Sequence, residues 1–529
     1  YDLFHEFGTP GNWRAPFVVI NDTIQTPNGV DDEFIWPYVH IGPSPDPDKR
    51  RVYVIGNNAY SPGNPSENVL IAYADFDDVD LENQSTFDWT YNTIPLLDEW
   101  NQGIPEWIRP HLSMCVSDDG KVALMGYNTN DEIFVFLNEN YGIGDYEYFS
   151  ECYQFNTWNP QNLNGSYFFA DENGEPYTLF WSFAPCNNMN SIFLDNSNKL
   201  NFCGSFGLQC YEGFYWFNLV YPKAFQFDID TQEFSFHDLY IEGANPSDNN
   251  PMVPWDLNED GIVDSLLQNG DPYMVEGFPL LYSYTGAAFH ENTFKIVKNE
   301  EKGWLAAVWH DGLKSKYAYE GVPGYEEWLE VPEIAICISA DNGESWSEVI
   351  FLNSIETPEF SEMIPVYIYP GDLIEDLGDD HGKLHLFFLD DYSYGSYVHG
   401  NGENLGGMQM YCSLDIDFDY LVLAENETIP QVSYELYNYP NPFNPETKIT
   451  FSVPNDFEKS PIEIYNVKGQ KVKTLECNNH VIAKATESLY HITWDGTDEN
   501  NKPVSSGVYL YKLSIDGKTK AVRKMILLR

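Results

Sequence analysis

Four glutamates occupy comparable positions along the chain and are of the residue type needed for acid–base chemistry. Each lies three or four residues before a proline that opens a predicted strand: Glu33, Glu106, Glu276 and Glu362. Two carboxyl groups at one site can act as general acid and as base or nucleophile, the arrangement used for glycoside hydrolysis. In a chain so rich in acidic residues, the same pattern also fits solvated surface charges or a cation site. Both interpretations stay open.

A second set of oxygen donors is concentrated in one nine-residue segment. Its oxygens fall at positions 1, 3, 5, 7 and 9 of an EF-hand-type calcium loop, the one at position 7 being a backbone carbonyl: Asp256, Asn258, Asp260, Ile262 and Asp264. Gly261 stands where such loops turn sharply, and position 12 is Leu267 instead of glutamate. The segment resembles the calcium loops of dockerins and other extracellular repeats. This resemblance implies a structural calcium ion that stiffens a long insertion.

Short strands must position these residues. Apolar segments separated by Asp, Asn and Gly turns recur throughout residues 1–429, and no convincing helical period appears. The strands group into five units of four, whose first strands begin near residues 37, 110, 185, 279 and 365. Repeated four-stranded units are typical of propellers, so the sequence predicts an all-β fold with a five-bladed, alternatively six-bladed, β-propeller. A generic β-sandwich is the competing interpretation.

One turn carries a family motif. Ser339, Asp341, Gly343 and Trp346 match the pattern S-x-D-x-G-x-x-W, which resembles the Asp-box of sialidase-like β-propellers. The resemblance implies that Ser and Asp hold a hairpin while Trp packs beneath it. Sialidase chemistry is disfavoured, because a sialidase holds its substrate carboxylate with three arginines from different blades. The arginines of residues 1–429 are only Arg14, Arg50, Arg51 and Arg109.

Long segments rich in Tyr, Trp, Gly and Asn are predicted to be loops on one face of the propeller. They span residues 57–68, 205–223, 241–278, 311–331 and 390–407. Binding function usually resides on such loops when a rigid scaffold carries them. The competing interpretation is that the aromatic side chains pack on one another to order their own loops.

The charge changes abruptly near residue 430. Residues 1–429 contain 14 basic and 71 acidic residues, a net charge of −57, whereas residues 430–529 contain 13 and 11, a net charge of +2. The change predicts a domain border, with an acidic propeller at 1–429 and a second domain at 430–529. So negative a field excludes nucleic acid as a partner, because that binding needs Lys and Arg against phosphates. It suits divalent cations or plain solubility.

Several motifs follow one another in the second domain. They include Tyr-Pro-Asn-Pro-Phe-Asn-Pro at 439–445, Trp-Asp-Gly at 494–496 and Ser-Gly-Val-Tyr-Leu-Tyr-Lys at 506–512. Short alternating strands with Gly or Asn turns predict an Ig-like sandwich. In this order the motifs resemble the C-terminal sorting domain of type IX secretion cargo. The resemblance implies that the export machinery is a partner of residues 430–529 and that the protein is secreted, extracellular or on the outer cell surface.

These observations together predict an exported, calcium-binding propeller protein without a membrane span. The chain begins with Tyr1 and no charged-then-apolar leader, so we expect that a signal peptide has been removed. The expected role is non-enzymatic: binding of a glycan or surface protein, or self-assembly into a homopolymeric surface layer or filament. The alternative is a glycoside hydrolase that uses the four glutamates.

Overall fold

The structure is a computed structural model that describes most of the chain. The described residues are 19, 24–26, 29–31, 35–59, 66–83, 85–100, 108, 110–184, 189–239, 252–258, 260–267, 269–277, 292–395, 397, 402–418, 436–439, 443–454, 462–466, 471–475, 480–483, 487–499, 501–515 and 518–527. Contacts divide the chain into two units, Tyr1–Leu423 and Ala424–Arg529. Strands hold 51% of the residues and helices 6%, which confirms the predicted all-β class.

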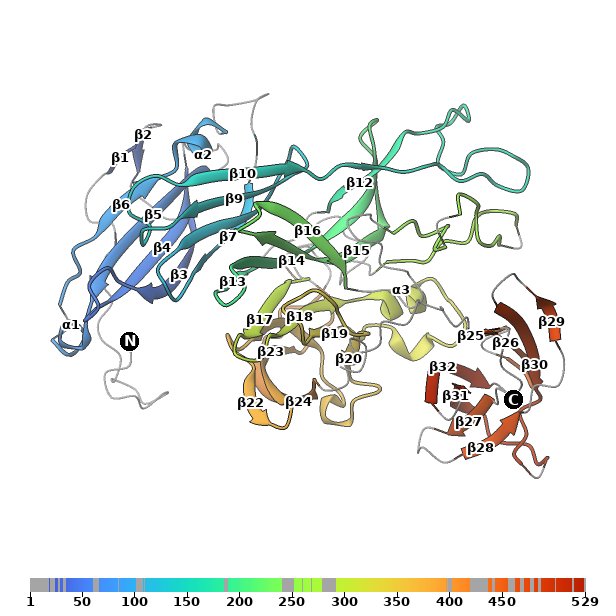
Figure 1. The fold of residues 1–529 in the computed structure, drawn as a ribbon. Coiled ribbons are helices and arrows are strands. Elements are labelled where there is room, and N and C mark those ends of the chain that lie inside the picture. Colours follow the sequence, from blue (N-terminus) through green and yellow to red (C-terminus); the bar gives the residue numbers. More distant parts are fainter. Residues whose placement is uncertain are drawn as a thin grey trace. The chain divides into compact units, whose positions relative to one another are not determined.

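Five antiparallel sheets dominate the described part of the first unit (Figure 1). The first is β3 (Ile35–Pro43), β4 (Arg50–Ala59), β5 (Ser66–Phe76) and β6 (Thr90–Thr93), and the second is β7 (Pro110–Val116), β8 (Val122–Asn128), β9 (Glu132–Asn138) and β10 (Glu147–Cys152). The third is β11 (Phe155–Asn156), β12 (Leu179–Phe183), β13 (Ser191–Leu194), β14 (Lys199–Cys210), β15 (Tyr215–Asp228) and β16 (Glu233–Asp238). The fourth is β17 (Lys295–Asn299), β18 (Trp304–Asp311), β19 (Glu333–Ser339) and β20 (Ile350–Leu352). The fifth is β21 (Pro365–Pro370), β22 (Glu375–Gly378), β23 (His381–Asp391) and β24 (Gly407–Asp417), and β1 (Ile24–Thr26) pairs separately with β2 (Gly29–Asp31).

Among the described residues, strands β3, β7, β13, β17 and β21 begin at Ile35, Pro110, Ser191, Lys295 and Pro365. The sequence predicted unit starts near 37, 110, 185, 279 and 365, and of these 185 and 279 fall outside the described residues. In the fourth sheet, β17 pairs with β18 and buries its apolar residues Ile296 and Val297. The predicted strand at residue 279 falls in the segment 278–291, outside the described residues.

Buried apolar side chains connect each sheet to the next. One core cluster joins the first and second sheets, a second joins the second, third and fourth, and a third joins the fourth and fifth. The first strands follow the same series, with contacts between β3 and β7, β7 and β13, β13 and β17, and β17 and β21. Strand β21 also lies near β3. Tyr369 of β21 neighbours Tyr38 of β3, and burial together with this neighbour raises the pKa of the Tyr38 hydroxyl.

The turn that follows β19 is closed by its own side chains. The buried Ser339 hydroxyl donates to Asp341 Oδ1 at 2.7 Å and accepts the Gly343 N–H at 2.9 Å. Trp346 Nε1 donates to the Gly343 carbonyl at 3.1 Å. Gly343 has φ of 89°, a conformation that glycine adopts without steric strain.

Helices are few and short in the described residues: α1 (Asp78–Glu82), α2 (Pro95–Glu99), α3 (Leu313–Tyr319), and the 3₁₀ helices η2 (Glu326–Trp328) and η3 (Pro358–Phe360). Elements of this length are too short to show a helical period. The segment 205–223, predicted to be a loop, is instead largely the hairpin of β14 and β15. Its alternating apolar residues, including Phe206 and Leu208, are buried and pair along the sheet.

The second unit contains two four-stranded antiparallel sheets. One has the order β25 (Leu436–Tyr439), β26 (Thr447–Pro454), β30 (Glu487–Trp494) and β29 (His480–Ala483), and the other β28 (Lys471–Leu475), β27 (Ile462–Asn466), β31 (Gly507–Ile515) and β32 (Lys518–Leu527). Both sheets contribute to one core, in which Trp494 and Leu513 are fully buried. Trp494 Nε1 donates to the Thr497 carbonyl at 2.9 Å, so the Trp-Asp-Gly motif anchors a turn. No helix in the described residues of either unit is long and apolar enough to span a membrane.

Candidate functional site: an aromatic pocket with an acidic end

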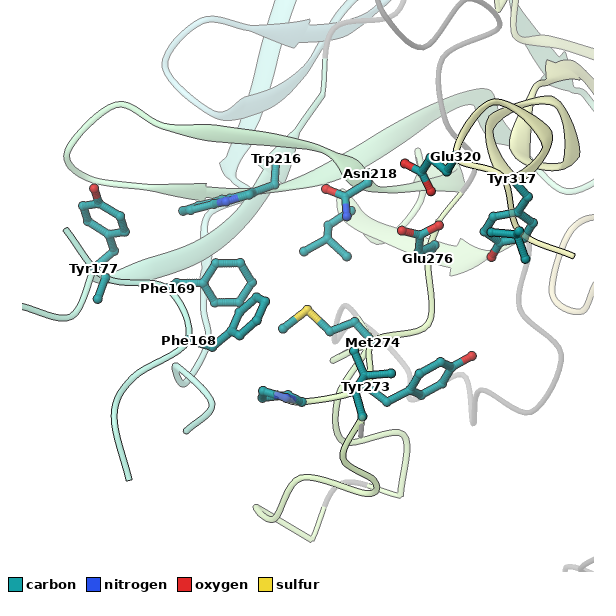
Figure 2. A pocket seen from close by; sticks show the side chains of 15 residues that line it. Phe168, Phe169, Tyr177, Trp216, Asn218, Tyr273, Met274, Glu276, Tyr317 and Glu320 are labelled. Carbon is teal, nitrogen blue, oxygen red and sulfur yellow. The ribbon is translucent and has the colours of Figure 1, made fainter. Parts of the chain in front are cut away.

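A pocket of about 610 Å³ opens beside β15 in the first unit. Four parts of the chain line it: the segment between β11 and β12, the start of β15, the insertion after β16, and α3 with the turn that follows. Aromatic rings gather at one end of the pocket and two carboxylates at the other (Figure 2). Pockets with apolar walls and a few converging polar groups are the usual binding sites of small ligands.

The aromatic end is built by edge-to-face packing. Trp216 and Phe169 lie 4.8 Å apart at 69°, and Phe168 packs on Phe169 at 4.9 Å and 87°. The Asn159 amide fixes the backbone here, because it donates to the carbonyls of Phe169 and Tyr177 at 2.6 and 3.1 Å. Phe169 is buried, whereas Phe168 is 38% exposed. The outer ring is therefore accessible while the inner ring holds it in place.

The acidic end is organised around one lysine of α3. Lys316 Nζ contacts both carboxylate oxygens of Glu276 at 2.9 and 2.8 Å and Glu320 Oε2 at 3.0 Å. The lysine side chain is 11% exposed, whereas Glu320 is about half exposed. Burial and the nearby Glu276 raise the pKa of Tyr317, so its hydroxyl stays protonated at neutral pH. The end thus offers carboxylate acceptors and a phenol to a ligand.

Helix α3 is held in place by buried polar contacts. Asp311 Oδ1 accepts the N–H of Leu313 at 2.8 Å, and the Ser315 hydroxyl bonds to Tyr394 at 2.8 Å. Lys314 contacts the buried carboxylate of Glu333 at 2.9 Å. Burial raises the pKa of Asp311 to about 6 and that of Glu333 to about 7. The position of Lys316 thus depends on a network whose acids titrate near neutral pH.

Of the four glutamates that the sequence proposed as a catalytic set, the structure describes Glu276 and Glu362. Glu276 lines the pocket. The other carboxylate that lines it is Glu320, which the sequence analysis did not single out. Glu362 is exposed in the turn before β21 and is not among the described residues that line the pocket. Glu33 and Glu106 lie outside the described residues.

The nine-residue segment of oxygen donors folds back on itself. The Asp256 side chain is buried, and its two oxygens accept the N–H groups of Asp260 and Gly261 at 3.0 and 2.9 Å. Asp264 accepts from the backbone of Leu257 at 2.7 Å and from the Asn258 amide at 2.8 Å. Side chains at positions 1, 3 and 9 therefore turn inward. An all-oxygen donor set of this kind suits a calcium ion.

A second group of acidic side chains lies around a lysine. Asp118, Asp195 and Glu300 are the one set of three acidic side chains, among the described residues, whose oxygens all lie within 4.8 Å of one another. Lys298 Nζ lies 2.8 Å from Glu300 and 3.7 Å from Asp195. Because this lysine lies between the carboxylates, we interpret the group as an ion-pair network that connects the second, third and fourth sheets.

The arginines give no support to a sialidase-type clamp. Arg51 is buried, its guanidinium forms two hydrogen bonds of 2.7 Å to Asp75, and it donates to the Tyr141 carbonyl at 2.9 Å. These bonds occupy the in-plane N–H groups that would bind a substrate carboxylate. Arg14 and Arg109 lie outside the described residues.

Sequence reasoning found part of the pocket and missed the rest. It predicted binding loops at 241–278 and 311–331, and both line the pocket. It missed the segment that carries Phe168, Phe169 and Tyr177, which was not among the predicted binding loops. A signal was present, since Asn and Gly turns alternate there with aromatic residues.

Comparison with known proteins identifies the second unit only. Residues 438–528 match the secretion system C-terminal sorting domain, so the chain carries the tail of a secreted type IX cargo protein. No curated protein matches the chain in sequence.

Two solved structures have partial likeness to the chain. Dimeric latent PorU from Porphyromonas gingivalis shares 11% identity at a TM-score of 0.17, over 84% of this chain and 36% of its own, so the chain spans about a third of that protein. Glycoside hydrolase family 32 from Bifidobacterium adolescentis shares 9% identity at a TM-score of 0.25, over 90% of this chain and 74% of its own. Both TM-scores are too low to carry an argument about fold or function.

Proposed function

We propose that this protein is an extracellular or cell-surface glycan-binding protein, exported through its sorting domain, that holds a neutral sugar in the aromatic pocket. The observation that carries the proposal is the pairing of accessible rings with carboxylate acceptors in one pocket beside β15. The exported tail supports it, because a secreted protein meets polysaccharides outside the cell.

The pocket chemistry matches the two surfaces of a sugar ring. The C–H face of a pyranose is apolar and slightly positive, so it packs against the negative face of an aromatic ring. Sugar hydroxyls donate hydrogen bonds, and carboxylates such as Glu276 and Glu320 accept them. A net charge of −57 over residues 1–429 repels acidic ligands, which favours neutral glycans over uronic or sialic acids.

Binding of neutral oligosaccharides by isothermal titration calorimetry tests the proposal. We expect Trp216→Ala to weaken binding at least tenfold, since loss of a buried aromatic contact commonly costs more than about 1–2 kcal/mol. Phe217→Ala is the matched control, because Phe217 is the adjacent residue on β15, is 47% exposed and does not line the pocket. Equal loss in both variants, or no binding by the wild-type protein to any neutral glycan, would refute the proposed role.

Hydrolysis is the second candidate, since Glu276 was proposed from the sequence as a catalytic residue. A general acid must reach the leaving oxygen with its proton. Both carboxylates that line the pocket contact the same lysine, which makes Glu276 better suited to accept a bond than to give up a proton. Release of reducing sugar ends that stops in Glu276→Gln would favour the hydrolase over the binding protein.

A calcium ion in the segment 256–264 would support the pocket wall. Trp255, Leu257 and Val263 pack in the same aromatic cluster as Phe169 and Trp216, so the loop and the pocket share one core. Met274 and Glu276 follow in the same insertion. Bound calcium would restrict this insertion and keep its lining residues in place, a structural role without a part in any reaction.

The finer fold assignments belong to the same proposal. Five sheets whose first strands follow one another from β3 to β21 favour a five-bladed propeller, and the closed turn at 339–346 favours an Asp-box. Two four-stranded sheets around Trp494 favour an Ig-like sandwich in the tail. Self-assembly into a surface layer or filament stays a prediction alongside glycan binding.

A further inference from the structure

One lysine is buried in a layer of aromatic rings in the third sheet. Lys223 of β15 is 1% exposed, and the residue directly opposite on β16 is Asp238, which is 8% exposed. Lys223 Nζ contacts Asp238 Oδ1, and no other polar contact to the Lys223 ammonium is found among the described residues. The amine and the carboxyl group thus face each other across one antiparallel pair.

The surroundings of this pair are apolar. Lys223 Nζ lies 6.0 Å from the ring centre of Phe206 and 5.7 Å from that of Phe236. These rings pack on each other at 5.1 Å, and Phe225 lies opposite Phe236, two register pairs along from Lys223 and Asp238. Burial lowers the pKa of Lys223 to about 7. An uncharged amine is therefore accessible at neutral pH, and apolar surroundings disfavour a charged pair in general.

We propose that Lys223 and Asp238 are joined by an intramolecular amide bond between the two side chains. The lone pair of the neutral amine attacks Cγ of the protonated carboxyl group, so a C–N bond forms. One C–O bond then breaks, and the hydroxyl leaves with a proton from nitrogen as one water molecule. No oxidant, reductant or cofactor enters this balance.

The fold favours condensation in two ways. Strand pairing holds amine and carboxyl in contact, which replaces a bimolecular encounter with an intramolecular one. The product amide carries no charge, so the buried layer no longer has to accommodate two ions.

The bond would connect two chain segments that lead into the candidate pocket. Strand β15 carries Trp216 and Asn218 at its start, and β16 ends at Asp238, immediately before the insertion that supplies Met274 and Glu276. A link between residues 223 and 238 would tie the strand that carries one wall to the segment that leads to another. The proposed amide bond does not depend on which ligand the pocket binds.

The intact mass of the full-length chain, measured under denaturing and reducing conditions, tests the bond. We expect a mass lower than the sequence value by one water molecule. Trypsin would then leave residues 200–295 as one peptide lacking one water, because Lys223 is the only lysine or arginine between Lys199 and Lys295. Recovery of free Lys223 by cleavage, at the full sequence mass, would overturn the proposal.

Two comparisons guard against other causes. Lys223→Arg keeps a cation but removes the amine, so the mass of this variant should equal the mass calculated from its sequence. If the variant does not fold, the mass and digest of the wild-type protein still decide the question. The pair of Lys314 and Glu333 has a contact of 2.9 Å but a 24% exposed lysine, so it should remain unlinked in the same digest. A water loss mapped to any other residues would also refute the bond.

Discussion

Replacing Asp311 by Asn should stabilise the first unit at neutral and alkaline pH. Asp311 is 1% exposed at the end of β18, and burial raises the pKa of its carboxyl from 3.8 to about 6. A shift of about two units corresponds to roughly 3 kcal/mol of unfavourable charging in the folded state. Asparagine cannot ionise, and its side-chain oxygen can still accept the N–H of Leu313. The expected gain above pH 7 is therefore about 1–3 kcal/mol.

The sign of the pH dependence follows from proton binding. Between pH 3.8 and about 6, the folded state holds the Asp311 proton more tightly than the unfolded state, so stability falls as pH rises through this window. Glu333, with its pKa raised to about 7, adds a decline of the same sign in both proteins. The difference between variant and wild type should thus be small near pH 4, grow toward pH 6 and stay constant above it.

Urea unfolding followed by tryptophan fluorescence at pH 4.5, 6 and 8 measures this difference. Asp88→Asn is the matched control, because Asp88 is exposed and its replacement should change stability little at any pH. A variant that is destabilised equally at all three pH values would refute the reasoning, since it would show that the carboxylate contributes a favourable contact instead of a charging penalty.

Three further predictions follow from the other sites. Calcium should raise the melting temperature of the wild-type protein, and a chelator should lower it. Asp256→Ala should abolish the calcium response, whereas Asp171→Ala, outside the segment 256–264, should not; equal responses would contradict a site in that segment. Lys316→Met should leave Glu276 and Glu320 without their shared cation and lower stability by about 1–3 kcal/mol, with a larger loss at low ionic strength that added salt reduces. Electron microscopy of the secreted protein should show dispersed particles if glycan binding is the main role, and ordered filaments or sheets at full-length mass would favour self-assembly instead.

Local patterns in the sequence predicted much of the fold. Short apolar segments between Asn, Asp and Gly turns predicted strands such as β8 and β19, because such segments are recognised from neighbours along the chain. The charge change near residue 430 and the tail motifs predicted a separate second domain with a sorting role, and the match at 438–528 confirms that role. The number of blades and the calcium ion stay predictions.

Errors arose where a contact distant in sequence decides the structure. Residues 205–223 form a hairpin because β14 pairs with both β12 and β15, which their loop-like Gly and Tyr content did not indicate. The predicted first strand of the fourth unit, near residue 279, lies outside the described residues and stays a prediction. Within the described residues β17 pairs with β18, and its Ile296 and Val297 pack against neighbouring sheets.

Composition and local patterns predicted an acidic all-β protein with a sorting tail, and they placed Glu276 and the oxygen-rich segment 256–264 among the residues of interest. Which residues meet became visible with the packing of the sheets and insertions. This packing brought Glu276 to Lys316, and it set Lys223 opposite Asp238 among aromatic rings. The physical reason is that strand patterns are read from near neighbours, whereas a pocket or a buried pair depends on how sheets and insertions far apart in the chain pack together.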